Sequence, residues 1–147
     1  MKAFNRVKVI TAWSATIVER AALFPDELLG NNDCTVVGLA DATGRSYSEA
    51  HALLARAGRE RGQSWFTTPY ECAIFDLGFK RVFGIYRGVV DLSTLVDMFP
   101  SGRLIAVIDM GKEIKHVVGI VEGKVYNALG DEDLSNAKVL DLWEYVL

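Results

Sequence analysis

A chain of 147 residues, half of them hydrophobic, can bury a core of its own, so we expect a single domain over residues 1–147. The formal net charge of -3 argues against nucleic acid as a partner, because phosphate binding favours a basic face. No run reaches the roughly 20 apolar residues of a membrane span, and residues 1–10 do not resemble a signal peptide. With only two cysteines, we expect reduced thiols, a cytoplasmic location and no membrane partner.

Helix signals dominate the first half of the chain. Ser46 and Glu49 have the spacing of a capping box, and Pro69 follows Thr68 at the favoured first position of a helix. The expected elements of this half are, in order, a strand over 6–11 and helices over 15–23, 35–43, 46–57 and 68–78. The first of these helices is expected to stop near Pro25.

From about Lys80 onward, apolar and polar residues alternate with the period of a β-strand. The expected elements of this half are strands over 80–86, 103–109, 114–121, 124–129 and 138–146 and a short helix over 93–99. Strands joined by short loops must run antiparallel, and the helices precede most of the strands. The sequence therefore predicts an α+β fold in which an N-terminal helical half packs on a C-terminal antiparallel sheet.

Cys34 is a candidate for a chemical role because of its place at the start of the helix over 35–43. Either Asn32 or Asp33 is the expected N-cap of that helix. A helix start lowers the pKa of a thiol, and the thiolate is the nucleophilic form. Asp33 would oppose this effect unless its carboxylate points into the cap. The alternatives are that Cys34 is a core thiol or forms a disulfide with Cys72, which is itself expected in the core.

His116 opens a strand, and its neighbour across the following hairpin can be worked out. With a two-residue turn at 122–123, Val118 lies opposite Asn127, which puts His116 and Asn127 on one face as diagonal neighbours. An imidazole that acts as a base needs a third group to fix its tautomer. Asn127 is placed to do this, unless it only ends its strand. Asp109 on the preceding strand is the rival orienting residue.

The order and settings of these residues resemble those of papain-like cysteine hydrolases. That family places its nucleophile at a helix start in the first half of the chain, and its His at the start of a strand in the second half. The stretch NDCTVV at 32–37 is similar to the helix start of small papain-like proteins from bacteria and phages. The stretch KHVVGIVEGKVYN at 115–127 resembles the family's His strand, Gly turn and orienting strand. The resemblance implies a papain-like fold with Cys34, His116 and Asn127 as its catalytic residues.

One feature of the family is missing from the matching region, which covers roughly residues 31–127. The family usually has a Gln six residues before the nucleophile, which donates a hydrogen bond to the oxyanion, and Leu28 occupies that place. Asn31 or Asn32 would have to supply the amide beside the backbone N–H of Cys34. Without such a substitute, the resemblance implies a catalytically inactive module that binds a protein partner; a structural subunit is a third alternative.

The expected reaction is hydrolysis of a peptide or amide bond in a protein or peptide substrate. His116 would take the proton of Cys34, and the thiolate would attack the carbonyl carbon. Trp65, Phe66 and Tyr70 lie between the helical half and the strands, where a papain-like cleft would run, so they are candidates to line it. Core packing or a lid loop is the alternative for these aromatic residues. No cofactor or metal is expected, because the two His and two Cys lack the spacing of zinc ligands and no Gly-rich phosphate loop is present.

Overall fold

The structure is a computed structural model that describes residues 11–14, 16–65, 68–83, 87–111, 114–128 and 132–146. The helices are α1 (Ile17–Leu23), α2 (Pro25–Gly30), α3 (Cys34–Thr43), α4 (Tyr47–Arg56), α5 (Thr68–Asp76) and α6 (Leu92–Met98). The strands are β1 (Thr11–Trp13), β2 (Phe79–Arg81), β3 (Arg103–Asp109), β4 (Lys115–Val121), β5 (Lys124–Asn127) and β6 (Lys138–Tyr145). The described strands form one six-stranded sheet in the order β1-β5-β4-β3-β6-β2.

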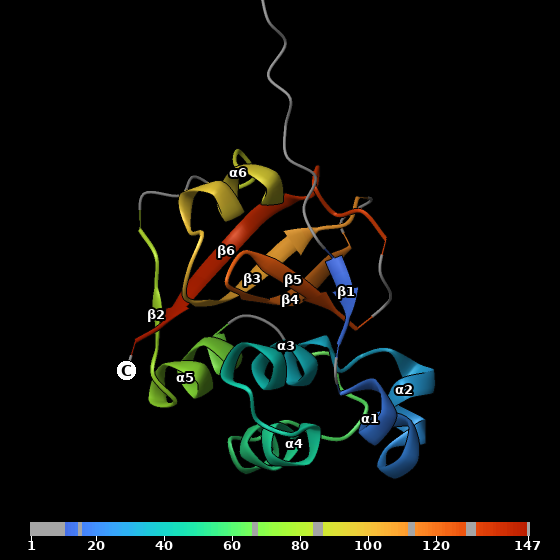
Figure 1. Cartoon of the computed structure of the whole chain (residues 1–147). Helices are drawn as coiled ribbons and strands as arrows, with labels where there is room; N and C mark the ends of the chain where they lie inside the picture. Colours follow the sequence, from blue (N-terminus) through green and yellow to red (C-terminus); the bar gives the residue numbers. More distant parts are fainter. Residues whose placement is uncertain are drawn as a thin grey trace, which may run out of the picture.

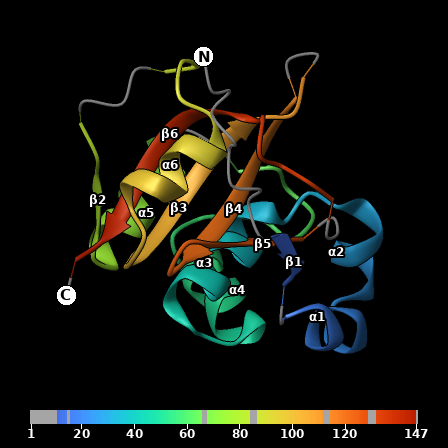
Figure 2. The same ribbon diagram turned by 45° about the horizontal axis from the view of Figure 1, so that its top comes forward.

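Helices cover both faces of this sheet (Figures 1 and 2). On one face lie α3 and α5, with α4 packed behind α3, and α6 covers the other face. Buried residues form two clusters, one on each side of the sheet, because successive side chains of a strand point to opposite faces. Val117 belongs to the cluster on the α3 side, and Val118 belongs to the cluster on the α6 side.

The predicted α+β class is confirmed, with two differences in the sheet. Five neighbouring strands, from β5 to β2, pair antiparallel, but β1 pairs in parallel with β5. The prediction of a purely antiparallel sheet is therefore wrong at that edge. The helical half separates β1 from β5, and a connection of that length permits parallel pairing. The strand expected over 80–86 corresponds to β2, which begins one residue earlier and ends at Arg81; residues 84–86 lie outside the described residues. Of the first strand, expected over 6–11, residues 6–10 also lie outside the described residues.

The predicted helix starts have mixed outcomes. The capping box of α4 is confirmed, since the Ser46 hydroxyl accepts a hydrogen bond from the Glu49 backbone N–H and the Glu49 side chain accepts one from the Ser46 N–H. Helix α1 ends at Leu23, as expected near Pro25, and Pro25 itself then occupies the first turn of a second helix, α2, which was not expected. The reason is that proline needs no N–H partner at a helix start.

Helix α3 packs so closely on β4 that glycine is needed on both elements. A Cβ atom added to Gly38 of α3 would lie 2.7 Å from a methyl group of Val117. A Cβ atom added to Gly119 of β4 would lie 2.9 Å from the Gly38 carbonyl oxygen. This approach fixes the start of α3, which carries Cys34, against the start of β4, which carries His116.

Candidate active site

The hairpin that joins β4 and β5 has the predicted register. Glu122 and Gly123 form the turn with positive φ angles of 50° and 75°, and Gly119 lies opposite Tyr126. Positive φ at both central positions is typical of the two-residue type I′ turn, whose twist matches that of the two strands it joins. The chain therefore carries Asn127 to the end of β5 at which His116 begins β4.

His116 and Asn127 form a buried hydrogen bond. The Nε2 atom of His116 lies 2.6 Å from Oδ1 of Asn127, and both side chains are almost fully buried. Because Oδ1 is an acceptor, Nε2 carries the proton and Nδ1 is left as the basic nitrogen of the ring. This is the contact that the sequence predicted for an orienting residue.

Asp109, the rival orienting residue, makes a different contact. It ends β3, where its carboxylate accepts a hydrogen bond of 2.8 Å from the Gly111 backbone N–H. In the β3–β4 register, Asp109 lies opposite Lys115, and His116 lies opposite Ile108. Side chains at neighbouring positions point to opposite faces, so Asp109 does not orient His116.

Cys34 is the first residue of α3 and packs against β4. The backbone N–H of Val117, the residue after His116, lies near enough to the Cys34 sulfur to lower the pKa of the thiol. The hydroxyl group of Tyr70 donates a 3.1 Å hydrogen bond to the Thr35 carbonyl and so covers the same helix start. Within the described residues, no hydrogen bond joins the Cys34 sulfur to the ring of His116.

Burial favours the neutral forms of both Cys34 and His116. For Cys34 this is the opposite of the expected thiolate. Loss of solvation raises the pKa of the Cys34 thiol to about 11, the Val117 N–H opposes this, and the charge of Asp33 raises it further. The expected lowering by the helix start is therefore wrong for this conformation, because Cys34 is only 8% exposed. Burial also lowers the pKa of His116. At neutral pH the two groups are a neutral thiol and a neutral imidazole.

The raised pKa of Cys34 predicts a loss of stability at alkaline pH. The folded protein keeps the thiol proton up to about pH 11, whereas the unfolded chain releases it near pH 9. Between these values the folded state binds more protons, so the free energy of unfolding falls as pH rises. A shift of this size corresponds to about 2–3 kcal/mol. Urea unfolding at pH 8 and pH 11 should show this loss in the wild-type protein and not in Cys34→Ala.

Other groups also titrate above pH 9, so the informative quantity is the difference between variant and wild type. Cys72 is exposed, and its removal should leave the alkaline loss as it is in the wild-type protein. If Cys34→Ala and the wild-type protein lose the same stability between pH 8 and pH 11, the thiol is not held neutral by burial.

The carboxylate beside Cys34 does not cap α3. Asp33 occupies the N-cap position without a side-chain capping bond, contrary to expectation. Its carboxylate binds the buried guanidinium of Arg20 through two nitrogens, with Nε 2.7 Å from Oδ2, and accepts a 2.6 Å hydrogen bond from the Tyr47 hydroxyl. A buried ion pair thus holds the residue that precedes Cys34, which the sequence did not reveal.

A second buried ionic group supports the same loop from the other side. Glu27 of α2 accepts hydrogen bonds from Arg59 at 2.8 Å and from the backbone N–H of Gly62, and contacts His51 at 3.1 Å. Arg59 also donates to the carbonyl oxygen of Asn32. The loop before Cys34 is therefore fixed by α1, α2 and the segment after α4 together.

The two candidate oxyanion donors, Asn31 and Asn32, are exposed beside Cys34. Asn31 ends α2 in a left-handed conformation, and its side-chain oxygen accepts a 3.1 Å hydrogen bond from Arg20. The side-chain oxygen of Asn32 accepts a 3.0 Å hydrogen bond from Ser64. In both residues the oxygen is engaged, which leaves the amide nitrogen as the group that can donate.

The aromatic candidates for a substrate cleft lie mostly in the core. Trp65 and Tyr70 are buried, and the ring of Tyr70 packs edge-on against Trp143. Core packing, the alternative for these residues, is what the structure shows for Trp65 and Tyr70, and Phe66 lies outside the described residues.

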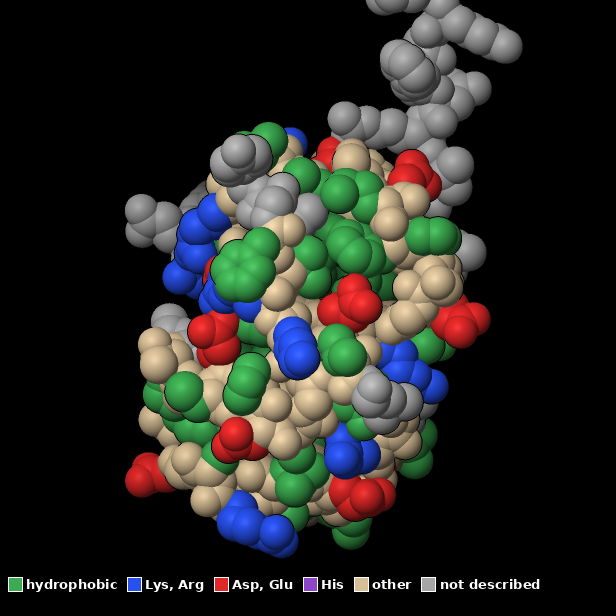
Figure 3. Space-filling model, turned by 90° about the vertical axis from the view of Figure 1, so that its left-hand side faces the viewer, with side chains coloured by type: hydrophobic (Ala, Val, Ile, Leu, Met, Phe, Trp, Pro, Cys, Tyr) green, Lys and Arg blue, Asp and Glu red, His purple; other side chains and the backbone are tan. Residues whose placement is uncertain are grey.

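Cys72 is exposed, so its predicted core position is wrong. It lies in an apolar surface groove with Phe75 and Phe83, on the face of the molecule that carries α5 and β2 (Figure 3). Helix α5 buries Ala73 and Ile74 instead. Both cysteines are free, which removes the disulfide alternative.

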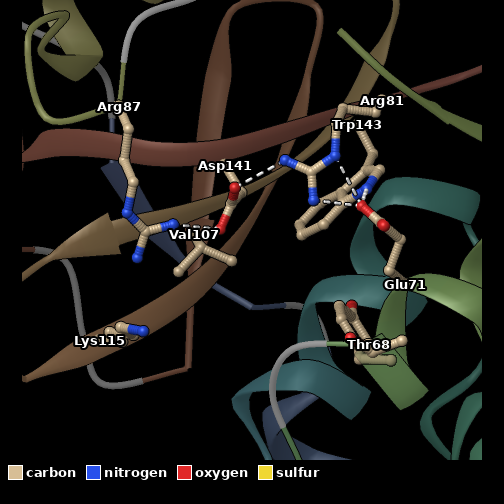
Figure 4. A pocket seen from close by; sticks show the side chains of 9 residues that line it. Thr68, Glu71, Arg81, Arg87, Val107, Lys115, Asp141 and Trp143 are labelled. Atoms are coloured by element: carbon tan, nitrogen blue, oxygen red, sulfur yellow. Dashed lines mark hydrogen bonds and ion pairs between the residues drawn. The ribbon is translucent and has the colours of Figure 1, made fainter.

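A pocket of about 250 Å³ lies close to the candidate site, between α5 and the strands β2, β3, β4 and β6 (Figure 4). Tyr70 lines this pocket and also covers the start of α3.

Within the described residues, no helix is long and apolar enough to cross a membrane. The same part of the chain holds no group of three His, Cys, Asp or Glu side chains suited to a metal ion.

Comparison of the chain with protein-family models, curated proteins and solved structures found no match. Inference about its function therefore depends on the residues themselves. The arrangement brings a cysteine at a helix start, an oriented imidazole and two side-chain amides to one end of the sheet. His116 lies opposite Ile108, so its ring belongs to the α6 face of the sheet, whereas Cys34 packs with Val117 on the α3 face. Acyl transfer by this set therefore requires a rearrangement that brings thiol and imidazole together.

Proposed function

We propose that the protein is a papain-like cysteine hydrolase that cleaves peptide or amide bonds in a protein or peptide substrate. One observation carries the proposal: the buried hydrogen bond between His116 and Asn127, on a strand whose next residue, Val117, lies beside Cys34. A buried His–Asn pair fixes the tautomer of the ring, as a general base requires. The helix start supplies the dipole that stabilises a thiolate once it forms.

In the proposed reaction, Nδ1 of His116 takes the proton of Cys34, and the thiolate attacks the substrate carbonyl carbon. The backbone N–H of Cys34 and the amide of Asn32 or Asn31 donate to the resulting oxyanion. His116 then protonates the leaving amine as the C–N bond breaks, which leaves an acyl group on the sulfur. A water molecule, deprotonated by His116, releases the acid and restores the thiol.

The structure is the resting state in this proposal. The buried thiol has a pKa of about 11, and the His116 imidazole has a lowered pKa, so charge separation is unfavourable until a substrate arrives. Binding must bring the sulfur and Nδ1 into contact, which lets the imidazolium stabilise the thiolate. The thiol is thus protected from general alkylation. In the free protein the exposed Cys72 should react faster with iodoacetamide.

The test is covalent trapping with p-nitrophenyl N-acetylglycinate, an activated acyl donor that needs no knowledge of the natural substrate. We expect a burst of p-nitrophenolate and an acetylglycyl adduct that peptide mapping places on Cys34. His116→Ala should slow acylation by at least about 100-fold, since general-base catalysis contributes about that much. Cys72→Ala is the matched control and should acylate at the wild-type rate.

Acylation of Cys72 alone, or an equal rate in His116→Ala, would contradict the proposal. An adduct that forms on Cys34 and is never hydrolysed would show that the oxyanion donors are insufficient without the missing glutamine.

A non-catalytic binding module is the second candidate, and the burial of Cys34 together with Leu28 favours it. In that case Cys34 is a core thiol, and His116–Asn127 is a buried polar pair that fixes the hairpin. Such a protein would give no burst with the ester. A partner would then be expected at the apolar groove beside Phe75 and Phe83, which are 61% and 86% exposed.

A further inference from the structure

We propose that the pocket between α5 and the sheet binds a carboxylate group of the substrate; this rests on the hydrolase proposal and names the chemistry of its ligand. The pocket has side chains of both charges. Figure 4 shows Arg81 between Glu71 and Asp141, Arg87 directed at Asp141, and Lys115 apart from these four. Three cations, Arg81, Arg87 and Lys115, line it together with two carboxylates, Glu71 and Asp141. The excess of one positive charge stands out in a chain of net charge -3.

The two carboxylates are already engaged by arginine. Arg81 contacts Asp141 at 2.7 Å and also pairs with Glu71, which accepts a further 2.8 Å hydrogen bond from the indole N–H of Trp143. Arg87 contacts the other oxygen of Asp141 at 3.0 Å through one nitrogen only, and its side chain is 53% exposed. Its remaining N–H groups contact no acceptor among the residues that the structure describes, so they are open to one in the pocket.

Lys115 supplies the positive charge that no carboxylate in the pocket neutralises. In the part of the chain that the structure describes, Lys115 forms no ion pair. Asp109 lies opposite it on β3, but that carboxylate accepts from the Gly111 N–H and does not reach the ammonium group. One excess charge matches a singly charged carboxylate better than a doubly charged phosphate.

The pocket borders the candidate nucleophile. Val107, which lines it, lies directly opposite Val117, and both belong to the same buried cluster as Cys34. Tyr70 forms another wall and covers the first turn of α3. Lys115 and Val117 are two positions apart on β4, so their side chains share the face of the sheet on which Cys34 packs. A carboxylate held by Arg87 and Lys115 would therefore place the adjoining part of a substrate beside Cys34.

The test is an NMR titration of the ¹⁵N-labelled protein with N-acetylglycine, which carries a carboxylate, and with N-acetylglycinamide, its neutral counterpart. We expect saturable shifts of the Trp143 indole and Lys115 amide signals with the acid, at millimolar concentration, and none with the amide. Lys115→Gln and Arg87→Gln should each weaken binding about fivefold, as the loss of one nearby charge implies. Lys124→Gln removes the same charge from the far end of the β4–β5 hairpin and should bind as the wild-type protein does.

Equal binding of acid and amide, or no saturable shift with either, would overturn the proposal, as would wild-type affinity in both pocket variants. N-acetylglutamic acid α-amide distinguishes the source of the group: tighter binding than N-acetylglycine indicates an acidic side chain, and weaker binding indicates a chain terminus. The titration does not involve the Cys34 sulfur. Binding without acylation of Cys34 would leave the carboxylate site standing and refute the hydrolase, and acylation without binding would do the reverse.

Discussion

Replacing Arg20 with leucine should destabilise the protein by about 3–5 kcal/mol, because it leaves the buried carboxylate of Asp33 without its counter-ion. Both side chains are almost fully buried, and the pair is joined by two contacts. The hydrogen bond from Tyr47 remains, but one neutral donor does not offset the loss of a guanidinium. Urea unfolding at pH 7, followed by circular dichroism, measures this loss.

Arg61→Leu is the matched control. Arg61 pairs with Asp26 in the same two-contact manner, but both side chains are about half exposed. An exposed pair contributes little, since solvent screens it, so this variant should unfold at nearly the wild-type urea concentration. Equal losses in the two variants would show that burial of the Arg20–Asp33 pair has no special weight.

The Arg20 variant should also affect Cys34. Asp33 precedes Cys34 directly, and Arg20 also holds the side chain of Asn31. Loss of the guanidinium frees the loop that carries the nucleophile and the candidate oxyanion donors. Acylation of Cys34 should therefore slow in whatever fraction of the variant remains folded.

Local signals explain which parts of the site could be predicted from the sequence. The turn at 122–123 contains a glycine, and strand pairing follows from it by geometry alone. That reasoning placed Asn127 beside His116, and the two are hydrogen-bonded. Likewise, the capping box of Ser46 and Glu49 depends only on residues three positions apart.

The ionic groups could not be predicted, because their partners are distant in the sequence. An arginine or a glutamate in a helix is most often solvated, and nothing beside Arg20 or Glu27 marks either as buried. Arg20 meets Asp33, and Glu27 meets Arg59, only after α1, α2 and α4 have packed together. The raised pKa of Cys34 has the same origin, since the helix start is a local feature of the sequence and burial is not.

The side of α5 that is buried also depended on tertiary packing. Cys72, Ala73 and Ile74 are all apolar, and the helix lacks the clear division into polar and apolar faces that would orient it. The sheet buries Ala73 and Ile74 and leaves Cys72 at the surface. Parallel pairing of β1 is a similar case, because the sequence contains no signal for the partner of an isolated short strand.

The central claim is that Cys34 and His116 act as one catalytic unit, and steady-state turnover of p-nitrophenyl N-acetylglycinate by single and double variants tests it most directly. Cys34→Ala should lower kcat/KM by about 10³-fold or more and His116→Ala by at least about 100-fold. The double variant should be little worse than Cys34→Ala alone, because groups that act together are not additive. All three variants should stay folded at pH 7 by circular dichroism. Turnover that persists in folded Cys34→Ala, or losses that multiply in the double variant, would contradict the account.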